Sequence, residues 1–411
     1  MKEKIKNEVM KFGGEPLATP QRIIRVAQFI KEKVENGNKI VVVVSAMGDE
    51  TRKLMQLAQK IYGGVPPSRE LDKLFITGEM RSASFLAIAL KSLGINAVSL
   101  TGSQIMLETD TNYGKAKIKR IHKIDRIVES LAQNKVVIVS GFQGVIEGTD
   151  EPVTLGRGGS DLTLVALTIA LGAKYCEKFT KIDGVFAIDP QVIPEAKRFE
   201  KISHSQMLQL ASAGASVLMD RCVWLAQAFG VDIWVGLSPS LGKTTGGTLV
   251  CSGGTLRNME GFISPQSGVA IKEGSLVTVS NIPNRPGAAA EVFRALSDIN
   301  IIDCAQGQGG ENANISILCK AEDLEQVLLR LNKVEKARTI GKGVDVVVLT
   351  LINSAMKEET GWLYRVANAI AQEGVNIEML STVGETILIV VKKEKLKQSA
   401  MALAKEFDLL S

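Results

Sequence analysis

The chain has 411 residues, of which 45% are hydrophobic and 23% charged, so we expect a globular protein of two or three domains. A net charge of +5, no long basic block and few Tyr and Trp argue against nucleic acid as a partner. Five scattered cysteines without a CxxC pair and only two histidines argue against a disulfide framework, a zinc site and a His-centred triad.

The N-terminus is charged and lacks the apolar core of a signal peptide. No run reaches the ~20 apolar residues that a membrane-spanning helix needs. We therefore expect a cytoplasmic protein without a membrane segment.

The first part of the chain alternates strands and helices. Residues 9–14 form a short strand that runs into a glycine turn, and Thr19 and Pro20 are the N-cap and first residue of a helix to about residue 34. Continuous β-branched runs, typical of strands buried on both faces, mark further elements. We predict strands at 39–45, 97–101 and 135–140 and helices at 51–61 and 68–93.

A glycine turn at residues 156–159 lies between a short β segment and an apolar helix to Leu171. Ser160 is the predicted N-cap, and Asp161 in the first turn suits the helix dipole. Backbone amides at such a turn bind anions, and Arg157 adds a two-pronged donor.

Further elements are predicted up to about residue 250: a strand at 176–180, helices at 205–212 and 217–229, and a last strand at 231–235. The alternation indicates an α/β domain with a parallel sheet covered by helices on both faces. Because ligands bind at the carboxyl ends of such strands, we expect the residues that follow them to converge. They are Lys11, Gly13, Ser45, Gly141 and Arg157.

Beyond residue 268 the pattern changes to a degenerate repeat of about seventy residues. Each copy reads strand, turn, helix, Asn-Ile and strands; the first copy has its helix at 288–299 and the second at 363–373. Two βαββαβ units side by side would form a small ligand-binding or dimerising module.

Several motifs occur in the order and spacing found in aspartate kinases. They are Lys11–Gly14, Val44–Met47, Thr77–Glu79, Gly141–Gly144, Gly156–Asp161, Asp183–Val185, Asp189-Pro190 and Pro194–Ala196. The tail, with Arg285–Gly287 and Asn376–Met379, resembles paired ACT domains. The resemblance implies an amino acid kinase domain at 1–255 and two ferredoxin-like ACT domains at 256–342 and 343–411, with a strand exchanged between them as an option.

The resemblance implies transfer of the ATP γ-phosphoryl group to the side-chain carboxylate of L-aspartate, opening the lysine, threonine and methionine branch. Lys11 would neutralise the moving phosphoryl group, and Asp161 would orient Lys11 and the metal-bound phosphates. Mg²⁺ would bridge the phosphates without a direct protein ligand. Aspartate would contact Ser45, Thr77, Glu79, Arg157 and Ser160, with Arg157 on its α-carboxylate and Glu79 on its amino group. The nucleotide would contact Gly13, Gly14, Thr180, Lys181, Asp183, Gly184, Asp189 and Pro190.

The chain departs from the family pattern mainly on the nucleotide side. Glu15-Pro16 replaces Thr-Ser, Lys181 replaces Asp, Gln191 replaces Arg and Ser216 replaces Lys. The lost Arg and Lys are the groups that the family pattern assigns to the ATP phosphates. A carboxylate at Glu15 about 5 Å from a phosphate oxygen would cost about 3 kcal/mol at an effective dielectric of ~20, unless it turns to solvent. Ile76 and Met219 also replace polar family residues.

These departures leave two interpretations. The favoured one is a working aspartate kinase in which residues at other positions bind the ATP phosphates. The alternative is a catalytically impaired sensor or regulatory partner that binds an amino acid without turnover. A kinase for glutamate derivatives or carbamate is disfavoured because it would lack the tandem tail and the 157–161 stretch in this form. A glycine-rich dinucleotide site is not supported, because no GxGxxG follows a strand.

The tandem tail implies a homodimer formed through the ACT domains. It also implies an effector, lysine or threonine, near Asn300, Ile301, Gln306, Asn376 and Ile377. The family's usual Gln-Asn is Gln306-Gly307 here, which leaves feedback an open question.

Overall fold

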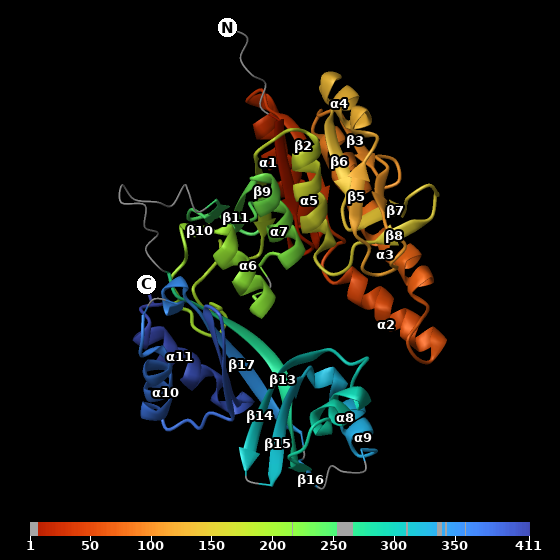
Figure 1. Cartoon of the computed structure of the whole chain (residues 1–411). Coiled ribbons are helices and arrows are strands. Elements are labelled where there is room, and N and C mark those ends of the chain that lie inside the picture. The colour runs from red at the N-terminus through yellow and green to blue at the C-terminus, as the bar shows by residue number, and fades with distance from the viewer. Residues whose placement is uncertain are drawn as a thin grey trace. The chain divides into compact units, whose positions relative to one another are not determined.

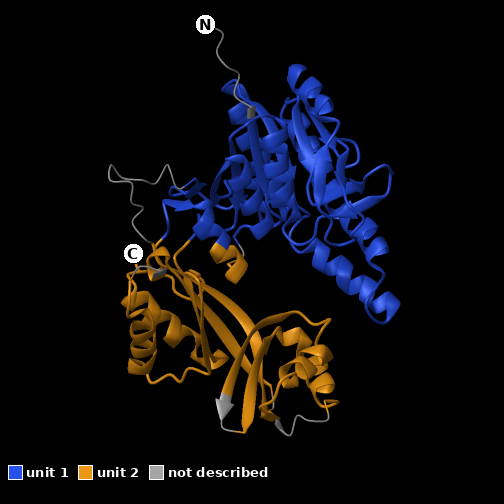
Figure 2. Cartoon of the chain, viewed as in Figure 1, with its two compact units in different colours: residues 1–185, 198–208, 216–263 blue, residues 186–197, 209–215, 264–411 orange. Residues whose placement is uncertain are grey.

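The computed structural model describes residues 7–215, 217–252, 266–309, 311–334, 339–341, 343–357 and 359–411. The chain divides into two compact units, which Figure 2 shows in blue and orange. The first comprises residues 1–185, 198–208 and 216–263, and the second comprises 186–197, 209–215 and 264–411. Within the described ranges, no helix is long and apolar enough to cross a membrane.

The first unit contains an eight-stranded sheet in the order β10-β12-β11-β9-β1-β2-β6-β3 (Figure 1). All neighbouring pairs are parallel except β11 and β12, which confirms the predicted mainly parallel sheet. The predicted last strand, 231–235, is β11, and the chain then reverses into a further strand, β12. The bounds are β1 Asn7–Phe12, β2 Lys39–Val44, β3 Ala97–Leu100, β6 Val136–Ser140, β9 Tyr175–Thr180, β10 Lys201–Ser203, β11 Asp232–Leu237 and β12 Thr248–Cys251.

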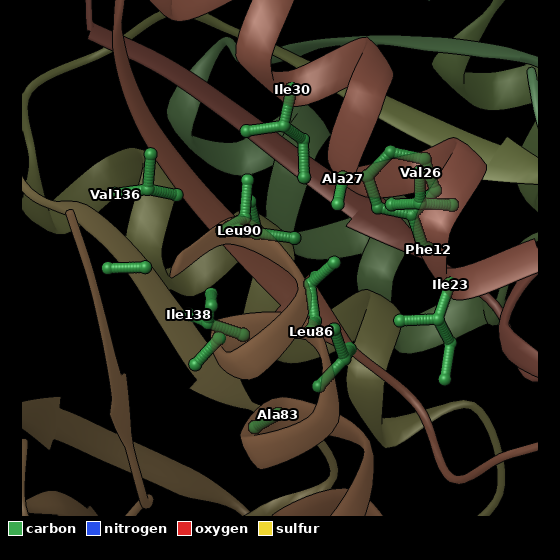
Figure 3. Close-up of a cluster of buried hydrophobic side chains, with 14 of the residues drawn as sticks. Phe12, Ile23, Val26, Ala27, Ile30, Ala83, Leu86, Leu90, Val136 and Ile138 are labelled. Carbon is green, nitrogen blue, oxygen red and sulfur yellow. The ribbon is translucent and has the colours of Figure 1, made fainter. Parts of the chain in front are cut away.

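Helices cover this sheet, with α1 and α3 on one face. Figure 3 shows the cluster in which Phe12 of β1 and Ile138 of β6 pack against Val26 of α1 and Leu86 of α3. Because side chains alternate along a strand, Val9 and Lys11 face the other way, where α5 packs on β1 and β2. The helices are α1 Pro20–Glu35, α2 Glu50–Tyr62, α3 Ser68–Ser92, α4 Ile124–Ala132, α5 Gly159–Ala170, α6 His204–Ala213 and α7 Asp220–Phe229, with a 3₁₀ turn at Glu15–Leu17.

A second, four-stranded sheet in the order β5-β4-β7-β8 belongs to the same unit and was not predicted. Its strands are β4 Leu107–Thr109, β5 Ile118–Ile121, β7 Gln143–Ile146 and β8 Pro152–Thr154. Strands of three or four residues are too short for a two-residue periodicity to stand out. The pairing of β7 with β8 holds Phe142, just before β7, close to the segment that follows Thr154.

In the second unit, both copies of the predicted repeat share one sheet, in the order β14-β15-β13-β17-β19-β18. The sixteen-residue strand β13, Gly268–Pro283, pairs with β17 up to Leu276 and with β15 from Ser275 onwards, so it belongs to both copies. The other elements are α8 Ala288–Ala295, β14 Ile301–Gly309, β15 Asn312–Cys319, α9 Leu324–Leu331, β16 Thr339–Ile340, β17 Val344–Ile352, α10 Trp362–Gln372, β18 Met379–Val383, β19 Thr386–Lys392 and α11 Leu396–Glu406. Helix α8 ends four residues before the predicted end. The predicted boundaries at 255, 256 and 342 lie outside the described residues and stay predictions.

Candidate functional site

The carboxyl ends of four adjacent parallel strands, β9, β1, β2 and β6, lie at one edge of the large sheet. The amide of Ser45 donates to the Phe12 carbonyl at 3.1 Å, and the amide of Gly141 donates to the Val44 carbonyl at 3.0 Å. These bonds bring together the segments that follow β1, β2 and β6. The predicted convergence is confirmed for the segments after these three strands, whereas Arg157 follows β8 of the four-stranded sheet.

A buried carboxylate, Asp161, lies between two buried ammonium groups. Lys11 Nζ donates to Asp161 Oδ1 at 2.8 Å, and Lys178 Nζ donates to Oδ2 at 2.6 Å. Lys178 also donates to the Val217 carbonyl. The two lysines are register partners on β1 and β9 and therefore point to the same face of the sheet.

Burial alone would raise the pKa of Asp161, but the two ammonium groups outweigh it and hold this pKa below its usual value. The pKa of Lys178 is lowered, first by burial, with repulsion from Lys11 adding to it against the attraction of Asp161. The sequence analysis did not single out Lys178. Its signal was a lysine inside a strand predicted to be covered on both faces.

The glycine turn places Asp161 in the first turn of α5, but the N-cap of this helix is not the predicted residue. Helix α5 begins at Gly159, and its N-cap is Gly158 in the left-handed conformation, with φ of +74°. A side chain at Gly159 would bring its Cβ to 2.7 Å from Leu155 Cβ. The prediction of Ser160 as N-cap is wrong because the glycine turn tightens one residue earlier; Ser160 instead accepts a hydrogen bond from the Ser45 hydroxyl at 3.0 Å.

Glu79, on α3, has one unsatisfied carboxylate oxygen. Its Oε1 accepts the Ala46 amide at 3.0 Å, whereas Oε2 is buried and has no partner in the part of the chain that the structure describes. The side chain belongs to a residue only 4% exposed, and this burial raises the pKa of Glu79 to about 7, although the Ala46 bond and Lys11 oppose it. A buried acceptor without a donor is a binding element for a cationic group.

A cavity of about 690 Å³ connects these groups and is lined by Lys11, Gly14, Ser45, Glu79, Arg157 and Ser160 among others. Arg157 is exposed, and its guanidinium has no hydrogen-bond or ion-pair partner among the described residues. Thr77 is not among the lining residues: it is exposed, and its hydroxyl donates to the Leu74 carbonyl at 2.6 Å.

Phe142 lines the same cavity in a strained backbone conformation, with φ of +70°. Its amide donates to Thr163 Oγ1 at 3.2 Å, and its carbonyl accepts the Leu155 amide at 2.8 Å. A bulky residue in this region costs about 1–3 kcal/mol and persists where the surroundings impose it, often at functional sites.

The glycine pair after β1 offers fewer donors than expected. The Gly13 amide donates to the Phe179 carbonyl at 3.2 Å, so it is already occupied, whereas the Gly14 amide has no partner among the described residues. The Glu15 carboxylate is exposed and paired with Arg22. The negative charge of Glu15, which would repel a nearby phosphate, is therefore paired with Arg22 and exposed to solvent.

The loop after β9 is held by Asp183. Its carboxylate accepts hydrogen bonds from Arg198, Thr244, Thr245 and the Leu237 amide. Burial would raise the pKa of Asp183, but these hydroxyl and amide donors lower it to about 2. At Gly184, where φ is +118°, a Cβ would lie 2.5 Å from Thr248 Oγ1. Thr180 ends β9, and Lys181 is exposed.

Asp189, Pro190 and Gln191 belong to the second unit. Asp189 is exposed and caps its own turn by accepting the Gln191 amide at 2.9 Å. Ser216 lies outside the described residues.

The predicted effector residues are also in the second unit. Asn300, Gln306 and Asn376 are exposed, and Ile301 and Ile377 are half-buried. The Asn376 amide donates to Glu378 Oε1 at 3.3 Å. Over the described ranges, no group of three or more His, Cys, Asp or Glu side chains could hold a metal ion.

Comparison with known proteins gives a consistent result. Residues 7–236 match the amino acid kinase family, and residues 277–334 and 349–407 match an ACT domain. The aspartokinase of Corynebacterium efficiens is 38% identical over 413 residues, covering 98% of this chain and 96% of the relative.

Solved structures agree with this likeness. Aspartate kinase from Synechocystis is 32% identical, with a TM-score of 0.55, and covers 99% of this chain and 70% of its own. E. coli aspartokinase III in complex with aspartate and ADP has a TM-score of 0.76 at 21% identity, covering 98% and 100%, which shows the shared fold.

Proposed function

The chain belongs to the amino acid kinase family and, within it, to the aspartokinases, and from this premise we propose that it transfers the γ-phosphoryl group of ATP to the side-chain carboxylate of L-aspartate, giving 4-phospho-L-aspartate and ADP. The observation that carries the proposal is that the ammonium group of Lys11 and the unsatisfied carboxylate oxygen of Glu79 line one cavity. The ammonium group of aspartate would pair with Glu79, and its two carboxylates would pair with the basic groups.

In this reaction a side-chain oxygen of aspartate attacks the γ-phosphorus, and the bond from that phosphorus to the bridging oxygen breaks, with its electron pair leaving on ADP. No proton has to move, so catalysis consists of positioning and charge neutralisation. Lys11 supplies positive charge to two anions that would otherwise repel each other. Asp161 holds the Lys11 ammonium in place through a hydrogen bond of 2.8 Å.

On the substrate side, Glu79 would accept the amino group of aspartate, which supplies the missing donor for Oε2. Arg157, exposed at the cavity, would bind the α-carboxylate with two parallel hydrogen bonds. The hydroxyls of Ser45 and Ser160 would orient the reacting carboxylate. Thr77, whose hydroxyl is occupied by Leu74, would act only if that bond is exchanged.

On the nucleotide side, Gly14 supplies the free amide that the proposal assigns to a phosphate. Thr180, Lys181 and Gly184 would border the nucleotide, and Asp183 would hold their loop in shape through its hydrogen bonds to four residues. Asp189 and Pro190, which the family pattern also assigns to the nucleotide, belong to the second unit, and their assignment stays a prediction.

Mg²⁺ suits this donor set as an ion carried by the nucleotide, since it takes ligands from phosphates and water when few carboxylates are at hand. Asp161, which the family pattern assigns to the metal-bound phosphates, is already bound by both lysines. When bound, Mg²⁺ would neutralise part of the phosphate charge.

The alternative of a sensor without turnover is not favoured. Its main support was the loss of nucleotide-side residues, but Glu15 is paired with Arg22 and a second lysine stands beside Asp161. Hydroxylamine trapping of aspartyl phosphate, with ATP, Mg²⁺ and aspartate, tests the proposal directly, with Asp161→Ala as the control. Equal background signal from both proteins would refute the kinase assignment.

We also propose that the ACT units form a homodimer and bind an amino acid effector near Asn300, Ile301, Gln306, Asn376 and Ile377. A solved structure of E. coli aspartokinase III contains lysine and aspartate, which makes lysine the first effector to test, with threonine as the second. Equilibrium ultracentrifugation showing a monomer would contradict the dimer, and unchanged activity with both amino acids would contradict the effector.

A further inference from the structure

Lys178 adds an uncompensated positive charge to the interior of the first unit. The residue is 6% exposed, and the largest electrostatic effects on its ammonium group come from Asp161, Lys11 and the Cys222 thiol. Burial raises the pKa of Cys222 well above its usual value, so this thiol is neutral. One carboxylate therefore serves two ammonium groups, an arrangement that costs free energy unless a further anion is bound.

The ammonium of Lys178 also retains an unused donor. It has three N–H groups, and within the described residues two of them are taken, by Asp161 Oδ2 and by the Val217 carbonyl. A structural lysine needs only one ion pair, and an apolar side chain would fill a buried strand position at lower cost. An anionic ligand would accept the unused N–H of Lys178 and balance the excess positive charge.

The position of the ammonium supplies the second argument. Its bond to the Val217 carbonyl brings it to the residue that follows position 216, where this chain has Ser and the family pattern has a phosphate-binding Lys. Lys178 reaches this place from β9, on the strand adjacent to that of Lys11. The chain thus lacks a lysine at position 216 and has one on β9 whose ammonium group is bonded to the next residue, Val217.

Resting on the proposed kinase activity, we propose that Lys178 is a phosphate-binding catalytic residue that supplies from β9 the ammonium group that the family pattern places at position 216. It would bind the transferring phosphoryl group together with Lys11, and Asp161 would hold both lysines in place until ATP enters. The nucleotide-side departures are then a relocation of charge rather than a loss.

The test uses the full chain and three variants: Lys178→Met, Ser216→Lys and the double variant. Lys178→Met keeps the length of the side chain and leaves the Lys11–Asp161 pair intact, so urea unfolding should shift little. We expect kcat/KM for ATP to fall by about 100-fold, as when one donor to a transition-state anion is removed. The double variant should recover most of this loss. Lys33→Met, which removes another ion-paired lysine, bonded to Glu8 and Glu177, is the matched control and should retain activity.

Three results would overturn the inference. In the first, Lys178→Met has the same kcat/KM for ATP as the parental protein. In the second, the double variant folds but is no more active than Lys178→Met, and in the third, Lys178→Met loses activity because it unfolds and Ser216→Lys does not restore it. If the parental chain makes no aspartyl phosphate, the proposed function fails, and Lys178 is judged by the affinity for the β,γ-imido analogue of ATP. Weaker binding in Lys178→Met that the double variant restores supports the inference, and equal binding in all proteins refutes it.

Discussion

Replacing Glu79 with Gln should remove the pH dependence of aspartate binding between pH 6 and 8. Burial raises the pKa of the Glu79 carboxyl from its usual 4.5 to about 7, and the ionised form is the one that would bind the ammonium group of aspartate. With a pKa of about 7, the ionised fraction rises about tenfold from pH 6 to pH 8. The kcat/KM for aspartate of the parental protein should rise by the same factor.

The same shift sets the effect on stability. Unfolded Glu79 loses its proton near 4.5 and folded Glu79 near 7, so the folded state binds more protons in this window and stability falls as pH rises through it. The cost is absent below pH 4.5 and reaches about 3 kcal/mol above pH 7. Glu79→Gln should therefore unfold at higher urea than the parental protein at pH 8, and at similar urea at pH 4.5.

The assay is hydroxamate formation at saturating ATP and Mg²⁺ with aspartate varied at each pH. Glu79→Gln experiences the same titration of ATP, so the ratio of the two profiles isolates the carboxyl group. Glu50→Gln is a suitable control because Glu50 is already paired with Arg81, and its profile should follow that of the parental protein. Parallel profiles for the parental protein and Glu79→Gln would refute the assignment of Glu79 to the amino group.

Three further predictions concern the same cavity. Arg157→Ala should raise KM for aspartate by at least tenfold with little change in KM for ATP, and the reverse pattern in initial-rate kinetics would show that Arg157 binds the nucleotide. Gly13→Ala should fold normally, because its Cβ would meet nothing closer than 3.7 Å. Gly14→Ala should lose stability, because its Cβ would lie 2.7 Å from two carbonyl oxygens, and similar urea midpoints for the two variants would contradict this contrast. Asp161→Asn leaves two buried ammonium groups without a counter-ion, so it should lower the free energy of unfolding at pH 7 by about 3–5 kcal/mol and also reduce activity. A urea midpoint equal to that of the parental protein would disprove the loss of stability. Since the pKa of Asp161 is lowered, its stabilising contribution is present above about pH 4 and should disappear as the pH falls through the folded-state pKa.

The large elements of the first unit could be predicted from local sequence. The β-branched run at 39–45 and the Thr19-Pro20 helix start encode β2 and α1, and the hydroxyl of Thr19 accepts the Arg22 amide as an N-cap should. The order of the motifs was enough to indicate the kinase family and the tandem tail. Of the small sheet, only β8 was predicted, as the short β segment before the glycine turn. Its other three strands were missed because three or four residues carry too little periodicity.

The sequence by itself determined the parallel sheet, the repeat and the family, because apolar periodicity and motif spacing are properties of neighbouring residues. The resemblance implied that Asp161 acts on Lys11, 150 residues away along the chain, but only the tertiary structure revealed Lys178 as a second partner of this carboxylate. That pairing depends on strand order and on a register that places both lysines on one face. The free oxygen of Glu79 and the occupied amide of Gly13 depend likewise on contacts between distant segments, which no local pattern specifies.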